Sequence, residues 1–137
     1  DAATPELLDD QAVLASIDAA VKFGHDARIR IADAKDELAA YASDGPVALW
    51  GAGSKGMTYL NLVAEESPVA AVVDINPRKA GAGVPGTSLT ISGPEALVAI
   101  KPTTVLVANP IYVAEIADTL TELGVRAETL PLWDERT

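Results

Sequence analysis

The chain has 137 residues, which is enough for one ordinary domain and too little for two. Ten Lys and Arg residues against twenty Asp and Glu residues leave a formal net charge of -10, and such a surface repels nucleic acid and anionic membranes. Without cysteine there are no disulfides and no thiolate metal sites, and a single histidine excludes a multi-histidine metal centre.

Neither a membrane span nor a targeting segment is visible in the sequence. No apolar stretch approaches the roughly 20 residues that cross a bilayer, and no signal peptide is recognisable. We therefore expect a cytoplasmic protein. The first residue is Asp1, which suggests an excised domain or a trimmed product.

Residues 1–45 are predicted to form a polar lead-in followed by a helical arm. An aspartate at position 9 or 10 can cap a helix, and apolar residues then recur at three- and four-residue spacing. Gly24 weakens the middle of this run, so the pattern is typical of one long helix or of two in series, over about residues 10–42.

From residue 46 onward, short apolar runs alternate with helical stretches. The predicted strands are residues 47–50, 69–74, 88–91, 104–108 and 126–130. The predicted helices follow Gly53 and cover residues 94–100 and 110–123. Buried runs joined by helices indicate a parallel sheet with both faces covered. Right-handed crossovers then favour an α/β, Rossmann-like three-layer domain over residues 46–137, with a five-stranded parallel sheet of order 3-2-1-4-5.

A glycine loop, Gly51-Ala52-Gly53-Ser54-Lys55-Gly56, stands between the first strand and the helix after it. In such loops the first glycine permits a tight turn, the second lets a ligand approach the backbone, and the third lets helix and strand pack closely. Free amides at the helix start favour an anion, and Lys55 adds an ammonium. The loop predicts a phosphate site, although the same glycines also suit a fold that has lost its ligand.

Two further segments are expected at the same edge of the sheet. Asp74 ends the second strand, where an acidic side chain can accept hydrogen bonds from a ribose diol. In the loop that follows, Arg78 and Lys79 are candidates for contact with a phosphate, although two basic residues on a loop are more often simply solvated. Asn109 ends the fourth strand and is a natural helix cap, so it is either structural or crevice-lining. Tyr112 either lines the crevice or packs against the core.

The sequence shows no catalytic apparatus of its own. The Tyr-x-x-x-Lys pair of short-chain reductases is absent. Neither the Gly-Lys-Ser/Thr of a phosphate-binding P-loop nor the Gly-x-Ser-x-Gly of a nucleophile elbow occurs. The common methyl-donor site has an acidic residue before the loop and a glycine at its fifth position. This sequence has Trp50 and Lys55 at these two positions. We therefore predict no catalytic residue and no metal ligand, in a domain that binds but does not catalyse alone.

Three motifs, GAGSKGMTYLN, VVDINPRKAGAGVPGT and VLVANPIYVAEI, resemble in order and spacing the carboxy-terminal domain of bacterial sugar C-methyltransferases. The resemblance spans essentially the whole chain. The positions that match the family pattern are Gly51, Ala52, Lys55, Gly56, Thr58, Leu60, Asn61, Val72, Val73, Asp74, Asn76, Pro77, Lys79, Gly81, Pro85, Gly86 and Thr87. The stretch VANPIY departs from the Leu-Pro-Trp-Asn of many members, which affects the expected sugar acceptor.

The resemblance implies a place in a larger enzyme. Relatives carry a zinc-binding segment, a central S-adenosylmethionine domain that holds the catalytic base, and this domain at the end, with a nucleotide-linked sugar between the last two. It thus implies a substrate-handling domain that binds no cofactor itself and partners the central domain of its polypeptide. The predicted nucleotide-sugar-binding residues are Gly51, Ala52, Gly53, Ser54, Lys55, Gly56, Asp74, Asn76, Lys79, Asn109 and Tyr112.

Two other functions fit the same residues. One is a non-catalytic sensor or regulatory module that binds NAD(P) or another nucleotide through the glycine loop and Asp74. The other is a scaffold whose vacant crevice packs against partner domains. The apolar stripe of the helical arm suits either the sheet or a second copy of the chain, so a homodimer stays open.

Overall fold

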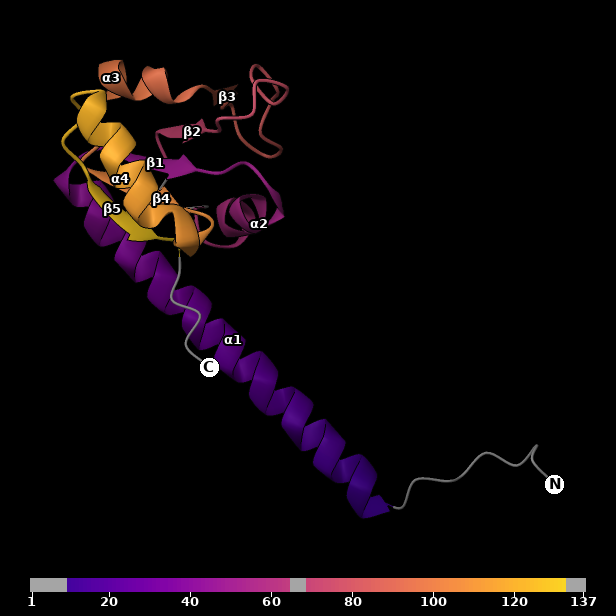
Figure 1. Cartoon of the computed structure of the whole chain (residues 1–137). Helices are drawn as coiled ribbons and strands as arrows, with labels where there is room; N and C mark the ends of the chain where they lie inside the picture. The colour runs from indigo at the N-terminus through magenta and orange to yellow at the C-terminus, as the bar shows by residue number, and fades with distance from the viewer. Residues whose placement is uncertain (1–9, 65–68, 133–137) are drawn as a thin grey trace. The chain divides into compact units, whose positions relative to one another are not determined.

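The computed structural model describes residues 10–64 and 69–132 (Figure 1). The chain divides into two compact units, Asp1–Asp33 and Ala34–Thr137. The domain boundary predicted near residue 45 stays a prediction, and the predicted lead-in lies outside the described residues. Among the described helices, none has the length and apolar character needed to cross a membrane.

Helix α1 (Asp10–Asp44) is one continuous helix, which decides between the two alternatives left by Gly24. In the first unit its apolar side chains are exposed, Leu14 and Val21 among them. In the second unit Ala34 and Leu38 are buried in a cluster with strand residues of the sheet. Their four-residue spacing places both on one helical face, which explains why this end of α1 belongs to the core.

The second unit contains a five-stranded sheet of order β3-β2-β1-β4-β5, in which every neighbouring pair is parallel. The strands are β1 (Val47–Trp50), β2 (Ala71–Val73), β3 (Ile91–Ser92), β4 (Thr104–Val107) and β5 (Glu128–Pro131). This confirms the predicted Rossmann-like fold and its strand order. Pro131 lies on an edge strand, where its missing N–H costs no ladder hydrogen bond.

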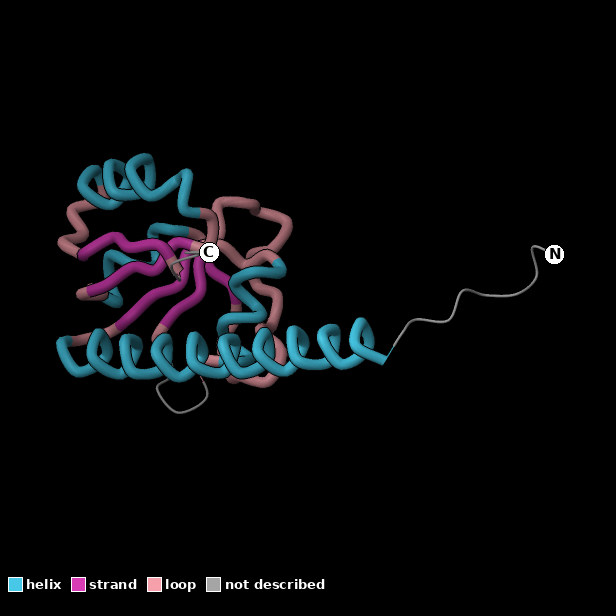
Figure 2. The backbone as a smooth tube through the Cα atoms, turned by 90° about the horizontal axis from the view of Figure 1, so that it is seen from below, coloured by secondary structure: helices cyan, strands magenta, loops and turns pink. Residues whose placement is uncertain are grey.

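Helices cover both faces of the sheet, so the unit has three layers (Figure 2). Residues 34–44 of α1 and helix α2 (Ser54–Leu62) pack with Val47 and Leu49 on one face. The other face, with Ala48 and Trp50, packs against α3 (Leu97–Ile100) and α4 (Val113–Glu122). Alternate β1 residues therefore enter opposite layers, and all four are buried. The short 3-10 helices η1 (Pro94–Ala96) and η2 (Pro110–Tyr112) lead into α3 and α4.

The third strand is shorter than the sequence predicts. Residues 88–91 are expected to be extended, but β3 begins only at Ile91. The reason is a local turn: Thr90 bridges Gly83 in antiparallel fashion, and the carbonyl of Leu89 accepts a hydrogen bond from the Val84 amide at 2.9 Å. The backbone before β3 is thus paired within its own loop and is not available to the sheet.

Candidate functional site

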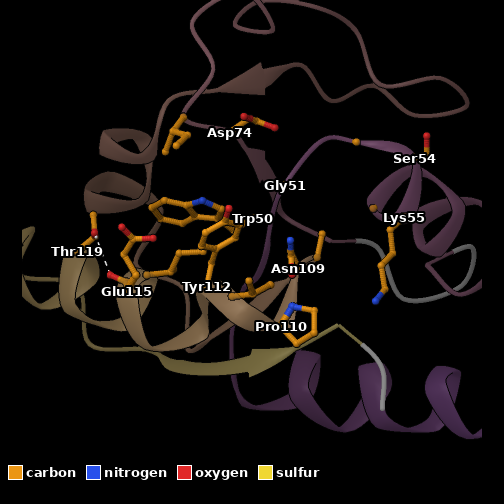
Figure 3. A pocket seen from close by; sticks show the side chains of 16 residues that line it. Trp50, Gly51, Ser54, Lys55, Asp74, Asn109, Pro110, Tyr112, Glu115 and Thr119 are labelled. Carbon is orange, nitrogen blue, oxygen red and sulfur yellow. Dashed lines mark hydrogen bonds between the residues drawn. The ribbon is translucent and has the colours of Figure 1, made fainter. Parts of the chain in front are cut away.

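A cavity of about 870 Å³ lies at the carboxyl ends of β1, β2 and β4 (Figure 3). It occupies the place where the chain order of the sheet reverses, which is the usual ligand position in open parallel sheets. Its volume is in the range of small-molecule sites. Of the predicted site residues, eight line this cavity: Gly51, Gly53, Ser54, Lys55, Gly56, Asp74, Asn109 and Tyr112.

The first and third glycines of the loop are fixed by close packing. Gly51 has a φ of 116°, and a Cβ there would lie 2.8 Å from the Cβ of Ala108. A Cβ on Gly56 would collide with the carbonyl oxygen of Gly51 and lie 3.3 Å from Leu49 Cδ2. Only a residue without a side chain fits at either position, and α2 therefore packs directly onto the end of β1.

The second glycine borders open space. Gly53 is the N-cap of α2 and lines the cavity, and a Cβ placed on it would meet no protein atom within 4 Å. No side chain caps this helix. The first-turn amides of a helix have no intrahelical acceptor, so the start of α2 at Ser54 offers backbone donors and the positive end of the helix dipole. Lys55 lines the cavity beside them.

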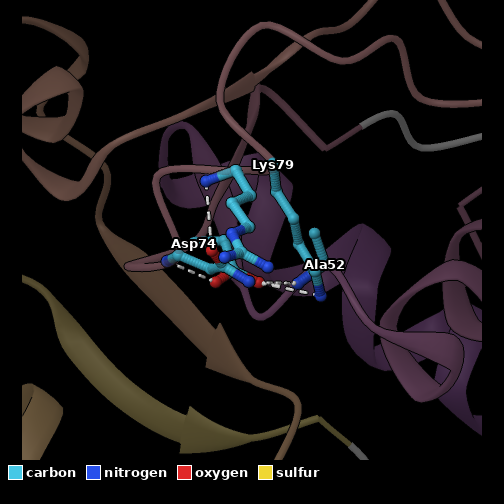
Figure 4. Close-up of polar contacts among 5 residues, drawn as sticks. Ala52, Asp74 and Lys79 are labelled. Carbon is cyan, nitrogen blue, oxygen red and sulfur yellow. Dashed lines mark hydrogen bonds and ion pairs between the residues drawn. The ribbon is translucent and has the colours of Figure 1, made fainter.

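The earlier amides of the loop are already bonded within the protein. The Gly51 amide donates to the carbonyl of Val73 at 2.8 Å. The Ala52 amide donates to Asp74 Oδ2, also at 2.8 Å (Figure 4). The segment from Gly51 to Ala52 is accordingly a structural turn whose amides are used within the protein.

Asp74 joins three parts of the chain (Figure 4). Its Oδ1 accepts a hydrogen bond from the Asn76 amide at 2.9 Å, and Lys79 Nζ lies 3.6 Å from Oδ2. Burial by itself would raise the pKa of Asp74, but the hydrogen bonds from the Ala52 and Asn76 amides and the charge of Lys79 outweigh it and lower the pKa. Asp74 is thus a stabilised carboxylate that also lines the cavity.

Three predicted site residues do not line the cavity: Ala52, Asn76 and Lys79. All three contact the Asp74 carboxylate instead. The side chain of Asn76 also accepts a hydrogen bond from the Arg78 amide at 3.0 Å, which fixes the turn after β2. Their observed contacts hold Asp74 in place at the edge of the cavity.

Asn109 both caps a helix and lines the cavity. Its Oδ1 accepts a hydrogen bond from the Ile111 amide at 3.2 Å, and Pro110 occupies the first helical position, as the sequence predicts. Tyr112, at the end of η2, is 47% exposed and faces the cavity (Figure 3).

Sequence reasoning missed the far side of the cavity. Glu115, Ile116 and Thr119 of α4 line it, together with Trp50, Ile75, Val107, Ala108 and Pro110. Glu115 and Thr119 are one helical turn apart, and the Thr119 hydroxyl donates to the Glu115 carbonyl at 3.1 Å. Their spacing on the helix after β4 is the sequence signal that points to this side. In the described ranges no group of three or more His, Asp or Glu residues gathers to hold a metal.

The sequence matches a known protein family. A family model described as "C-methyltransferase C-terminal domain" matches residues 8–129. The chain belongs to this family. The match includes the glycine loop, Asp74 and the whole of α4, so every residue that lines the cavity of this C-methyltransferase C-terminal domain falls within it.

Two solved structures resemble the domain. UDP-D-quinovosamine 4-dehydrogenase from Vibrio fischeri aligns with 59% of this chain and 73% of its own, at 25% identity and a TM-score of 0.49. A structure described as RSP in complex with beta-NADH aligns with 68% of this chain and 48% of its own, at 21% identity and a TM-score of 0.49. No curated protein matches the sequence.

Proposed function

We propose that this domain is the substrate-handling part of a sugar C-methyltransferase and binds a nucleotide-linked sugar in the cavity at the carboxyl edge of its sheet. Membership of the C-methyltransferase C-terminal family supports the enzyme class. The observation that carries the proposal is the start of α2, where the N-cap Gly53 and the first-turn residues Ser54 and Lys55 border one side of the cavity. Such a helix start favours a diphosphate.

The remaining lining suits the other parts of such a ligand. Asp74 borders the cavity with two carboxylate oxygens that together have about four acceptor positions, and the protein donors occupy some of them. The others are available to the hydroxyls of a ribose. Ile75 and Tyr112 add exposed apolar surface for a flat or ring-shaped group.

In the proposed enzyme the methyl group comes from S-adenosylmethionine, bound by a central domain of the same polypeptide. The glycine loop here supports this division of labour, because Lys55 carries a positive charge that repels a sulfonium and attracts a diphosphate. The role of this domain is then to hold and orient the substrate in the cytoplasm, with no catalytic group of its own.

Titration of the 137-residue chain tests the proposal. We expect UDP-glucose and dTDP-glucose to bind weakly and S-adenosylmethionine not to bind, as measured by calorimetry. Lys55→Gln should weaken the binding of UDP about five- to tenfold, since one charge-assisted contact is worth about 1.5–3 kcal/mol and the site is partly solvated. Lys22→Gln, on the exposed part of α1, is the matched control. Tight binding of S-adenosylmethionine, or no binding of any nucleotide, would overturn the proposal.

A second candidate is an NAD-binding sensor, which the position of Asp74 at the end of β2 favours. It predicts that NADH binds more tightly than UDP-glucose. Quenching or enhancement of NADH fluorescence on titration, with UDP-glucose as competitor, separates the two functions.

A further inference from the structure

We propose that one stripe of helix α1 is a self-association surface, on which a second copy of the chain packs antiparallel to the first. The α1 stripe consists of Asp10, Leu14, Ile17, Val21, Gly24 and Arg28. It belongs to the first compact unit and shares no residue with the described lining of the cavity. The inference is therefore independent of the proposed nucleotide site.

The apolar side chains of the α1 stripe face water in the single chain. Leu14 is 62% exposed, Ile17 is 53% exposed and Val21 is 66% exposed. Helices in proteins take most of their stability from packing an apolar face, and contiguous exposed apolar surface marks interaction sites. A second helix that covers these three side chains would therefore stabilise the first unit.

The spacing of the α1 stripe is that of a coiled-coil seam. Its six residues follow one another at alternating intervals of four and three positions, so they form a line along one side of α1. Between residues 10 and 28 a helix rises roughly 27 Å. On one flank of the seam, Val13, Ala20 and Ala27 recur at seven-residue spacing and widen the apolar face. A second helix can accordingly lie along the whole stripe.

The charges at the two ends of the α1 stripe select the direction of pairing. When two copies run in opposite directions about an axis at residue 19, Asp10 of each copy faces Arg28 of the other. In a parallel pair each of these residues would instead meet its own copy, and like charges repel. A shift by one heptad would place Ile17 against Arg28, or Val21 against Asp10. The charges thus favour one direction and one register.

The same alignment places large residues against small ones. Leu14 of each copy faces Gly24 of the other, and Ile17 faces Val21. A Cβ on Gly24 would meet no described atom within 4 Å, so the surface is open at this position. A glycine inside a helix costs stability, but it lets a second backbone approach closely. The pairing therefore gives Gly24 a role, which is to receive Leu14 of the second copy.

Analytical ultracentrifugation of the 137-residue chain tests the inference. A contact of this length is at the low end of specific interfaces, so we expect a monomer–dimer equilibrium with a dissociation constant of about 10–100 µM. Asp10→Arg turns both end contacts into like-charge pairs, and so does Arg28→Asp. Each should weaken dimerisation about tenfold. The double variant, or an equimolar mixture of the two, should restore it.

The matched controls lie on the opposite face of α1. Asp26→Arg and Arg30→Asp make the same changes of charge at positions about 160° around the helix from the middle of the stripe, at about 100° per residue. Both should dimerise within about twofold of the unmodified chain, because solvent screens charges on the outer face. If Asp26→Arg weakens dimerisation as much as Asp10→Arg, the seam is wrong.

Single cysteines report the direction, because the chain has none of its own. In the antiparallel pair Leu14→Cys faces Gly24→Cys, whereas two copies of either position lie roughly 15 Å apart along the axis, beyond disulfide reach. A mixture of the two variants should therefore form a disulfide-linked dimer that neither forms alone. Crosslinking of Leu14→Cys with itself would show a parallel pair and overturn the inference. A chain that stays monomeric at about 500 µM would also overturn it and assign the stripe to a different partner.

Discussion

The Ala52 amide donates a 2.8 Å hydrogen bond to Asp74 Oδ2 across 22 positions of sequence. This contact ties the glycine loop after β1 to the end of β2. It also uses the Ala52 amide within the protein, so this amide is not a donor for a ligand. The same carboxylate lines the cavity, so one residue both holds the loop conformation and forms part of the cavity wall.

The Asp74→Asn substitution is expected to loosen the glycine loop. An asparagine has one acceptor oxygen for the two amides and turns a donor group toward the other, and it loses the attraction of Lys79. Hydrogen bonds to charged groups are worth about 1.5–3 kcal/mol, and Asp74 is partly exposed, so we expect a loss of about 1–2 kcal/mol in the free energy of unfolding. Urea denaturation measures it. Asp118→Asn, on exposed α4 surface, is the control and should change stability by less than about 0.5 kcal/mol.

The same carboxylate makes stability depend on pH. Because folding lowers the pKa of Asp74 below its ordinary value of 3.8, its contribution is fully present above that value and is lost as the pH falls through the folded-state pKa. The stability gap between the unmodified chain and Asp74→Asn should therefore be constant from pH 7 to pH 5 and shrink below about pH 3.8. Urea midpoints of both proteins across this range measure the gap. A gap that widens on acidification would contradict the assignment.

The fold was predictable because each buried strand is a short apolar run, and β1 and β4 are buried along their whole length without polar alternation. Prediction failed at residues 88–90, because the pairing of Leu89 with Val84 and of Thr90 with Gly83 depends on a turn that periodicity does not encode. The bonding of Asp74 to Ala52 could not be predicted either, because an acidic residue at that position suits a ribose equally well. Glu115 was overlooked because an acid in the first turn of a helix ordinarily serves the helix dipole.

The three loop glycines should respond differently to alanine, and Gly56 and Gly53 give the clearest pair. Gly56→Ala places a methyl against the Gly51 carbonyl, which cannot move without displacing the end of β1. Overpacking of this kind costs about 1–3 kcal/mol. Gly53 has a φ of -85°, which alanine adopts freely, and a methyl group at this position would have no protein atom within 4 Å. Gly53 is also the N-cap of α2, where alanine is less favourable than glycine, so we expect Gly53→Ala to change the free energy of unfolding by less than about 1 kcal/mol.

Nucleotide binding should be weakened in Gly53→Ala even though its packing is undisturbed. In Gly53→Ala the added methyl borders the cavity where a phosphate would approach the backbone, so the affinity for UDP should fall although the fold is intact. Calorimetric titration beside thermal unfolding gives both quantities. Unchanged UDP affinity in Gly53→Ala would place the diphosphate away from α2.

Asn109 allows its two roles, cap and cavity wall, to be separated by a pair of substitutions. Asn109→Ala removes the acceptor for the Ile111 amide and should cost about 0.5–2 kcal/mol of stability. Asn109→Asp keeps the acceptor, so the cap and the stability should be retained, but it adds a negative charge to the cavity. We expect Asn109→Asp to bind UDP several-fold more weakly than Asn109→Ala does, because like charges repel across the partly solvated site. If the aspartate variant binds UDP as tightly as the unmodified chain, the phosphates do not lie near the end of β4, and the ligand enters the cavity without passing Asn109.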